Sequence, residues 1–214
     1  MHNTSIIGSG AVAEALAVRL AAAGHRVVVG TRSPQRARDL PAEVTDIATA
    51  AAAAPIVVNA LPGAVAVDVL APLREALAGR TLVDIGNAVD TGPDGFASGL
   101  RHPGGSLAAR LQEALPATRV VKALNTLGPP SMMVDPLAAA STFLCGDDGR
   151  AKVEVTAWLA DLGWSARQVI DLGGVGTAWW PESFVMVVRP LVAALGPVPF
   201  ALAIVTAGST GVTA

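Results

Sequence analysis

The chain has 214 residues, a formal net charge of −2 and a single cysteine, Cys145. This length suits one large domain, and the absence of any block of Lys or Arg argues against a nucleic-acid partner. A lone cysteine excludes an internal disulfide and a cysteine-built metal site and suits a reducing compartment. Because no basic and apolar leader precedes the first predicted strand, we expect a cytoplasmic protein.

The N-terminal segment carries the clearest pattern. Residues 6–34 read IIGSGAVAEALAVRLAAAGHRVVVGTRSP, which predicts a strand, a glycine turn, a helix and a second strand. Gly8 and Gly10 leave the turn without side chains, and Ala13 lets the helix pack closely on the sheet. The unpaired N–H groups of the first helical turn can face a pyrophosphate. This context predicts a dinucleotide as the ligand.

The end of the second predicted strand indicates which dinucleotide. NAD-binding proteins usually place Asp or Glu there, whereas this chain reads Gly30-Thr31-Arg32-Ser33. A carboxylate would repel a 2′-phosphate, but a guanidinium with neighbouring hydroxyls can donate charge-assisted hydrogen bonds to it, and Arg36 can add a charge. We therefore expect NADP(H). The alternative, that Arg32 and Arg36 are ordinary solvated charges, stays open for Arg36.

Strands and helices alternate along the rest of the chain. Further helices are expected near 34–40, 46–54, 64–77 and 150–162. Further strands are expected at 56–61, 81–85, 119–124, 141–145 and 168–171. Segment 89–105 is rich in Gly, Pro and Asp and is expected to be an irregular loop near the site. The pattern predicts an α/β fold with a Rossmann-like, doubly wound, mostly parallel sheet over 1–172. A small helical segment, 173–214, follows, or belongs to the same domain.

Ligands of such folds lie beyond the carboxyl ends of the strands. Besides the glycine turn, the residues there are Leu61 and Pro62, Asn87, and Asn125. Asn125 is either a turn former, which we favour, or a hydrogen-bonding group for the substrate. Lys122 is either a strand-edge cation, which we favour, or a ligand contact.

The chain offers few groups for acid/base catalysis. It has no tyrosine, and none of its three histidines occupies a position typical of an oriented acid or base. Asp147 and Asp148 precede a helix and are expected to cap it, so we predict no metal site. Cys145 is expected to be a small core residue. Hydride transfer between two flat cofactors needs mainly parallel stacking, and this chain suits that reaction better than reduction of a carbonyl.

The C-terminal part is apolar but too interrupted to span a membrane. Stretch 191–205 is broken by Gly196, Pro197 and Pro199 and is shorter than the roughly 20 residues of a spanning helix. It is expected to pack a dimer or to cover the sheet. Trp179 and Trp180 are expected either to stack on a flat ligand or to pack in a dimer interface, and both readings stay open.

Several stretches together resemble a known family. The glycine unit quoted above is followed by ALPG, by VVKALNTLGP, by FLCGDDGRAKVEV, and by GW with VIDLGG shortly after. These stretches are similar to NADPH-dependent reductases of the deazaflavin coenzyme F420, small Rossmann enzymes of archaea and actinobacteria. The similarity covers nearly the whole chain. It implies hydride transfer between NADP(H) and coenzyme F420, and a homodimer built with the C-terminal part.

The resemblance also implies roles for individual residues. The pyrophosphate is expected on Ser9, Gly10, Ala11 and Val12, which follow Gly8 in the turn. The 2′-phosphate is expected on Thr31, Arg32, Ser33 and Arg36. Leu61 and Pro62 are expected beside the nicotinamide. The acceptor is expected near Asn125 and near Gly176, Thr177 and Ala178, to which Asn87 and Trp179 are added.

One position departs from the family pattern. Relatives often carry arginine or another polar residue where this chain has Trp179, and the tail of the deazaflavin is anionic. Two alternatives therefore stay open. The protein is an NADPH-dependent reductase of another flat or imine-like acceptor, or it is a non-catalytic NADPH-binding sensor.

Overall fold

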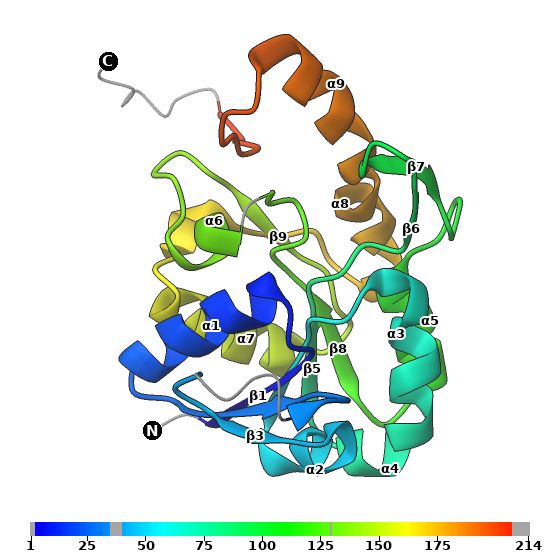
Figure 1. The fold of residues 1–214 in the computed structure, drawn as a ribbon, viewed down its shortest axis with the longest axis vertical. Helices are drawn as coiled ribbons and strands as arrows, with labels where there is room; N and C mark the ends of the chain where they lie inside the picture. The colour runs from blue at the N-terminus through cyan, green and yellow to red at the C-terminus, as the bar shows by residue number, and fades with distance from the viewer. Residues whose placement is uncertain (1–2, 35–39, 129, 207–214) are drawn as a thin grey trace.

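The computed structural model describes residues 3–34, 40–128 and 130–206, and its centre is a six-stranded sheet in the order β3-β2-β1-β4-β5-β8 (Figure 1). Its strands are β1 (Asn3–Ile7), β2 (Arg26–Gly30), β3 (Glu43–Thr45), β4 (Ile56–Asn59), β5 (Thr81–Asp84) and β8 (Arg119–Lys122). All neighbouring pairs are parallel, and Val and Ile fill most central positions, as in sheets covered on both faces. The predicted Rossmann-like α/β fold is confirmed. Strand β3 was not predicted.

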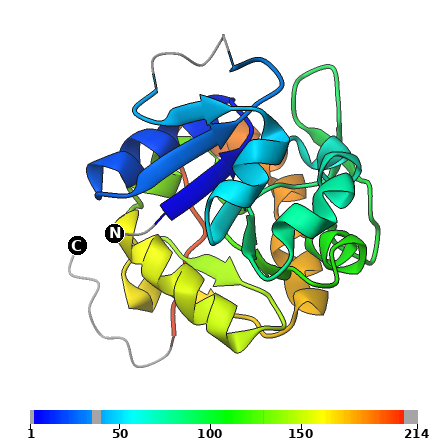
Figure 2. The same cartoon turned by 90° about the horizontal axis from the view of Figure 1, so that it is seen from below.

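Helices cover both faces of the sheet (Figure 2). One face carries α1 (Ala11–Ala22), α6 (Pro130–Val134) and α7 (Gly149–Asp161). The other carries α2 (Ile47–Ala53), α3 (Gly63–Leu70), α4 (Arg74–Leu77) and α5 (Leu107–Ala114). Successive strand residues face opposite sides, so that Ile6 belongs to the core beneath α1 and Ile7 to the core beneath α2. This alternation gives the molecule two apolar layers.

One sequence-based expectation about a helix needed correction, and helix α5 was missed. The helix expected over 64–77 is interrupted at Ala71–Leu73, a short 3-10 segment that contains Pro72, because proline cannot donate the backbone hydrogen bond that a continuous helix requires. Helix α5 was not predicted; Ser106 caps it by accepting a hydrogen bond from Ala109 N at 3.0 Å. The helix expected near 34–40 falls mainly on residues 35–39, outside the described residues.

The segment expected to be an irregular loop, 89–105, contains a hairpin instead. Strands β6 (Val89–Thr91) and β7 (Ala97–Leu100) pair antiparallel with an irregularity between Asp90 and Thr91. The prediction was wrong because turn residues at the tip dominate the composition, while the two strands are short. The hairpin rises from the carboxyl edge of the sheet.

Strands β9 (Thr142–Leu144) and β10 (Val169–Asp171) form a separate parallel pair. One antiparallel bridge between Lys122 and Cys145 joins this pair to β8. Cys145 is buried, as expected for a core residue, and burial raises the pKa of its thiol. Asp148 caps α7 as predicted, accepting a hydrogen bond from Ala151 N at 2.8 Å, whereas Asp147 accepts one from Val175 N at 2.9 Å.

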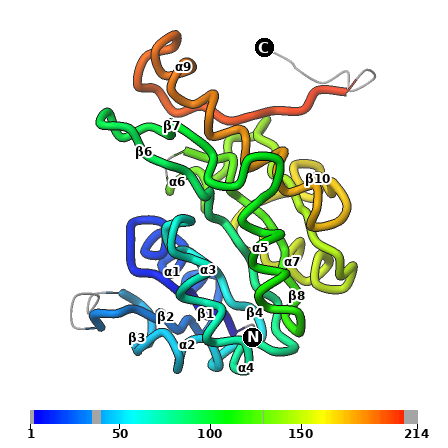
Figure 3. The backbone as a smooth tube through the Cα atoms, turned by 90° about the vertical axis from the view of Figure 1, so that its right-hand side faces the viewer, coloured from blue at the N-terminus to red at the C-terminus, as the bar shows by residue number. Residues whose placement is uncertain are grey.

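The C-terminal part contains three short helical pieces and one longer helix: Ala166–Gln168, Val175–Ala178, α8 (Trp179–Ser183) and α9 (Val185–Leu195). Helix α9 lies beside the β6–β7 hairpin, far from the sheet (Figure 3). Arg189 Nε on α9 contacts Asp94 Oδ2 in the hairpin at 2.8 Å. None of the residues of α9 is buried. None of the helices in the described parts of the chain has the length and apolar composition that a bilayer crossing requires.

Candidate functional site

The glycine turn lies between β1 and α1 and is shaped by its close approach to β4. Gly8 has φ +128°, and a Cβ at this position would lie 2.5 Å from Ala60 O, so only glycine fits. Gly10 has φ −87°, and a Cβ there would meet no atom within 4 Å. The N–H groups that follow Gly10 in α1 have no side-chain cap. The turn therefore offers space and donors to an anion.

At the end of β2, two hydroxyl-bearing residues flank Arg32 in the chain. Thr31 is nearly buried, its Oγ1 lies 3.0 Å from Ser9 Oγ, and it accepts a hydrogen bond from Ser33 N at 3.3 Å. Arg32 is exposed, and its guanidinium makes no ion pair or side-chain hydrogen bond with any of the described residues. Arg36 lies outside the described residues. This cluster can receive a phosphate.

One cavity of about 460 Å³ brings these two groups together with the end of β4. It is lined by Gly8, Ser9, Gly10, Ala11, Val12, Gly30, Thr31, Arg32, Ser33, Ile47, Ala60, Leu61 and Pro62. Every described residue that the sequence suggested for NADP(H) is in this set. None of the described residues of this lining is a carboxylate, so the described lining favours an anionic ligand.

The next strand ends carry an asparagine pair. Asn87 Nδ2 donates to Asn125 O at 2.9 Å, and Asn125 Nδ2 donates to Asn87 Oδ1 at 2.9 Å. Leu124, which precedes Asn125, has φ +57°, a conformation that side-chain-bearing residues rarely adopt. This turn brings Asn125 back to Asn87. Asn125 lies in a turn, as the favoured reading expects, and its amide links two strand ends, whereas its role toward a substrate stays a prediction.

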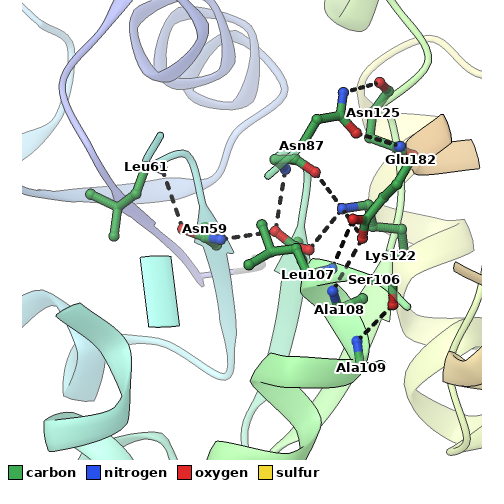
Figure 4. A network of polar contacts seen from close by, with 12 residues as sticks. Asn59, Leu61, Asn87, Ser106, Leu107, Ala108, Ala109, Lys122, Asn125 and Glu182 are labelled. Carbon is green, nitrogen blue, oxygen red and sulfur yellow. Dashed lines mark hydrogen bonds and ion pairs between the residues drawn. The ribbon is translucent and has the colours of Figure 1, made fainter. Parts of the chain in front are cut away.

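Lys122 lies beneath this pair in a buried ionic cluster (Figure 4). Its Nζ lies 2.9 Å from Asp84 Oδ2 and 2.8 Å from Glu182 Oε1, and it also donates to Gly86 O. Strand β8 is at the edge of the sheet, as favoured, but Lys122 is fully buried rather than solvated. The favoured reading of Lys122 as a strand-edge cation therefore agrees with its place in the sheet, and its burial, with Glu182 of α8 as a partner, was not foreseen.

The electrostatics keep this lysine charged. Burial by itself lowers the pKa of the Lys122 ammonium, but the charges of Asp84 and Glu182 and their hydrogen bonds more than offset burial, so its pKa is raised. All three N–H groups of the ammonium have acceptors, and none is left for a ligand. Lys122 is thus neither a ready proton donor nor a ligand contact in this arrangement.

Glu182 connects the cluster to a helix end. Its Oε2 accepts a hydrogen bond from Leu107 N at 2.7 Å and its Oε1 one from Ala108 N at 3.1 Å, at the first turn of α5. A carboxylate at a helix N-terminus also interacts favourably with the helix dipole. Sequence reasoning missed this cluster. The available signal was a polar residue, Asn59, Asp84 or Lys122, at the end of each of three apolar runs.

The segment expected near the acceptor lies between this cluster and a second cavity. Thr177 Oγ1 donates to Gly174 O at 2.7 Å, and Ala178 is buried. Trp179 and Trp180 stack on one another, with ring centroids 3.9 Å apart. A cavity of about 650 Å³ is lined by Thr126, Phe143, Leu172, Thr177, Trp180, Pro181, Ser183, Phe184 and Leu202. Asn87, Asn125, Gly176 and Trp179 do not line it, so the expected acceptor residues are not gathered around one cavity.

Comparisons with known proteins agree with this site. The family described as NADP oxidoreductase, coenzyme F420-dependent, matches residues 3–88. A crystal structure of a putative F420-dependent NADP reductase from Arthrobacter sp. FB24 is 35% identical, with a TM-score of 0.87, covering 96% of this chain and 100% of that one.

Two curated relatives are more distant. The F420-dependent NADP reductase of Methanothermobacter thermautotrophicus is 29% identical over 189 residues, which cover 80% of each chain. The metalloreductase STEAP3 of Rattus norvegicus is 30% identical over 176 residues, and the match spans 81% of this chain but only 34% of the metalloreductase. The chain therefore matches about a third of that relative. On the full-length similarity to the Arthrobacter structure, the chain belongs to the family of coenzyme F420-dependent NADP oxidoreductases.

Proposed function

We propose that the protein transfers a hydride between NADP(H), bound in the cavity at the glycine turn, and the deazaflavin coenzyme F420. The observation that carries the proposal is the cavity itself. Among the described residues, the cavity has uncapped N–H groups at one end, Arg32 without a partner beside Thr31 and Ser33 at the other, and no carboxylate in its lining. This arrangement suits a dinucleotide with a 2′-phosphate.

Each part of the cavity has a proposed role. The turn from Gly8 to Val12 binds the pyrophosphate, and Thr31, Arg32 and Ser33 bind the 2′-phosphate, with Arg36 as an expected further contact. Leu61 and Pro62 flank the nicotinamide, which, when bound, supplies or accepts the hydride. Leu61 is held by a hydrogen bond from its N–H to Asn59 Oδ1 at 3.3 Å. The side chains of the cavity thus bind the nucleotide and orient its nicotinamide.

The surrounding side chains support positioning rather than acid/base catalysis. Lys122 has all its donors engaged, as described above. His25 lies at the amino ends of β1 and β2, where its ring nitrogens contact Thr4 Oγ1 at 3.0 Å and Asp161 Oδ2 at 2.9 Å. Transfer between stacked rings needs the two reacting carbons held roughly 3–3.5 Å apart and no proton donor of this kind. We propose Asn87, Asn125 and the segment from Gly176 to Trp179 as the acceptor side.

The direct test mixes purified protein, NADPH and oxidised coenzyme F420 and follows the absorbance of the deazaflavin. Loss of that absorbance, fast with NADPH and slow with NADH, is the expected result. Folded protein that binds NADPH and leaves the deazaflavin oxidised would contradict the proposed acceptor.

A different acceptor has one observation in its favour. The cavity beside Thr177 is walled by Phe143, Trp180 and Phe184 and is mainly apolar. Such a wall suits a flat or imine-like acceptor without an anionic tail. Oxidation of NADPH by a cyclic imine, with none by coenzyme F420, would select this alternative. Tight NADPH binding without turnover on either compound would select a sensor.

We propose further that the protein is a cytoplasmic homodimer, with 173–214 as the dimerisation segment. Helix α9 is almost entirely apolar, yet Val187 and Leu195 are 42% and 55% exposed. An exposed apolar helix is typical of a protein interface. Light scattering is expected to give the mass of a dimer, and that of a monomer for Val187→Asp. The control Val153→Asp, at an exposed position of α7, should stay dimeric. A monomeric wild type would contradict the proposal.

A further inference from the structure

Three neighbouring strands each end in a buried polar side chain, and the three lie in register. Asn59 of β4 pairs with Asp84 of β5, which pairs with Lys122 of β8, and all three side chains are fully buried. Asn59 Nδ2 donates to Asp84 Oδ1 at 2.8 Å, and Lys122 Nζ donates to Asp84 Oδ2 at 2.9 Å. We name Asn59, Asp84, Lys122 and Glu182 the polar row. It crosses the carboxyl edge of the sheet directly below the candidate site (Figure 4).

The two ends of the polar row reach opposite sides of the candidate site. At one end, Asn59 Oδ1 accepts the N–H of Leu61, which lines the nucleotide cavity. At the other end, Glu182 lies on α8, directly after the segment proposed to face the acceptor. The polar row is therefore a continuous line of hydrogen bonds and ion pairs between the cofactor side and the acceptor side.

The contacts of the polar row permit little variation in geometry. Lys122 uses its three N–H groups on Asp84, Glu182 and Gly86 O, and Glu182 uses both oxygens on Lys122 and the first turn of α5. A buried charge that loses such a partner is left uncompensated in the interior, so displaced arrangements are strongly disfavoured. Two carboxylates face one ammonium, and the N-terminus of α5 compensates the excess negative charge. Helix α8 is thus fixed to the strand ends by charge as well as by packing.

From this geometry we propose that the polar row acts as a set of positioning residues, which fix the distance between the nicotinamide side of the cavity and the acceptor segment 176–179. The proposal rests on the proposed function. None of the four residues needs to touch either substrate. Because hydride transfer is steep in the separation of donor and acceptor, a small displacement of α8 reduces the rate of transfer while NADPH binding, which depends on the other end of the cavity, is retained.

The test replaces Glu182 with glutamine and uses Glu113→Gln as the matched control. Glu113 lies on α5, and its exposed side chain pairs with Arg110 at 3.1 Å. For Glu182→Gln we expect an NADPH dissociation constant within about twofold of the wild type. With coenzyme F420 as acceptor, we expect kcat lower by about tenfold to a hundredfold and a larger isotope effect with deuterated NADPH. Glu113→Gln should match the wild type in all three.

A second readout reports the position of α8 without any acceptor. Reduced nicotinamide absorbs where tryptophan emits, so energy transfer from Trp179 and Trp180 to bound NADPH depends on their separation. Trp158 and Trp164, in the core, provide a constant background. Transfer efficiency is expected to change in Glu182→Gln and not in Glu113→Gln. A folded variant with wild-type transfer efficiency and wild-type kcat would overturn the proposal.

Two additions cover the remaining outcomes. If Glu182→Gln fails to fold, Glu182→Asp, which keeps the charge and shortens the reach, is expected to show the same changes to a smaller degree, and wild-type values for it would overturn the proposal. If the wild type binds no NADPH, the proposed function fails. Amide hydrogen exchange of the free protein then tests the polar row independently of the proposed function. Faster exchange at 107–114 and 175–183 in the variant, with 11–22 unchanged, supports the polar row as the anchor of the segment, and unchanged exchange overturns it.

Discussion

The two ends of the carboxyl edge of the sheet treat their polar groups in opposite ways. At the β1–β2 end, the first turn of α1 has no side-chain cap and Arg32 has no partner among the described residues. At the β5–β8 end, every N–H group of Lys122 has an acceptor, and Glu182 caps a helix. Unpaired groups at a surface are available to a ligand, whereas paired groups in the interior hold the protein in one arrangement. Substitutions at the two ends should therefore affect different properties.

The largest effect is expected for Lys122→Met, on stability. The variant leaves Asp84 and Glu182 buried without their cation, which should lower the free energy of unfolding by about 3–5 kcal/mol. Denaturant unfolding at neutral pH measures it. Lys152→Met is the control, because Lys152 contacts Asp171 at 2.8 Å in a pair whose carboxylate is half exposed, and it should cost at most about 1 kcal/mol. Equal losses of unfolding free energy in Lys122→Met and Lys152→Met would show that burial of the Lys122 cluster does not add to its contribution.

At the other end, Arg32→Ala is expected to change binding and leave stability unaltered. Loss of one charge-assisted contact should weaken NADPH binding by about 1.5–3 kcal/mol and hardly change NADH binding. Calorimetric titration with both nucleotides gives the difference. Arg26→Ala, at the opposite end of the same strand and paired with exposed Glu43, is the control and should bind NADPH as the wild type does. Equal losses for both nucleotides would remove the 2′-phosphate from the assignment.

In the glycine turn, substitutions two positions apart should affect stability and NADPH binding separately. Gly8→Ala places a Cβ against Ala60 O at a left-handed φ, so it should lower the free energy of unfolding by about 1–3 kcal/mol. Gly10→Ala meets no protein atom, so its melting temperature should match the wild type. Its Cβ occupies the space proposed for the pyrophosphate, and NADPH affinity should fall. Normal NADPH binding by folded Gly10→Ala would contradict the proposed pyrophosphate position.

The same contrast explains what the sequence could predict. Most of the nucleotide end comes from one continuous unit, residues 6–33, in which strand, turn and helix follow one another. Periodicity and the glycine spacing were therefore sufficient to predict that part. The β5–β8 end depends on Glu182 reaching Lys122 from a helix far along the chain. No local pattern specifies such a contact, so the sequence indicated only a cation at a strand edge and not its burial.

The hairpin β6–β7 and helix α5 were missed for different reasons. The hairpin strands are short runs between turn formers, and β7 contacts α9. Helix α5 has local signals, the cap Ser106 and the buried face of Leu107 and Leu111, but it is short and follows a segment rich in Gly and Pro. By contrast, α7 was predicted because Val155, Trp158 and Leu159 recur at helical spacing and are all buried. Local signals therefore identified the framework, and the long-range contacts around the acceptor side were beyond them.

The smallest expected effect tests how much a hydrogen-bonded carboxylate contributes to stability when it is exposed. Asp46 caps α2 by accepting hydrogen bonds from Thr49 Oγ1 at 2.7 Å and Thr49 N at 2.9 Å, and these bonds, the side-chain bond first, lower the pKa of its carboxyl. A lowered folded-state pKa stabilises the protein above the unfolded-state pKa, and this contribution is lost as the pH falls through the folded value. Asp46→Asn should thus melt slightly below the wild type at neutral pH.

The difference should vanish in acid, where the wild-type carboxyl is protonated as well. Thermal melts from neutral to acid pH measure it, with Asp68→Asn, an exposed carboxylate on α3, as the control that should show no such trend. A pH-independent difference for Asp46→Asn would mean that the carboxylate charge contributes nothing. Because Asp46 is exposed, water can replace most of the hydrogen bonds that the cap provides. The difference between the small loss of stability expected for Asp46→Asn and the large loss expected for Lys122→Met is therefore due to burial and not to the number of hydrogen bonds.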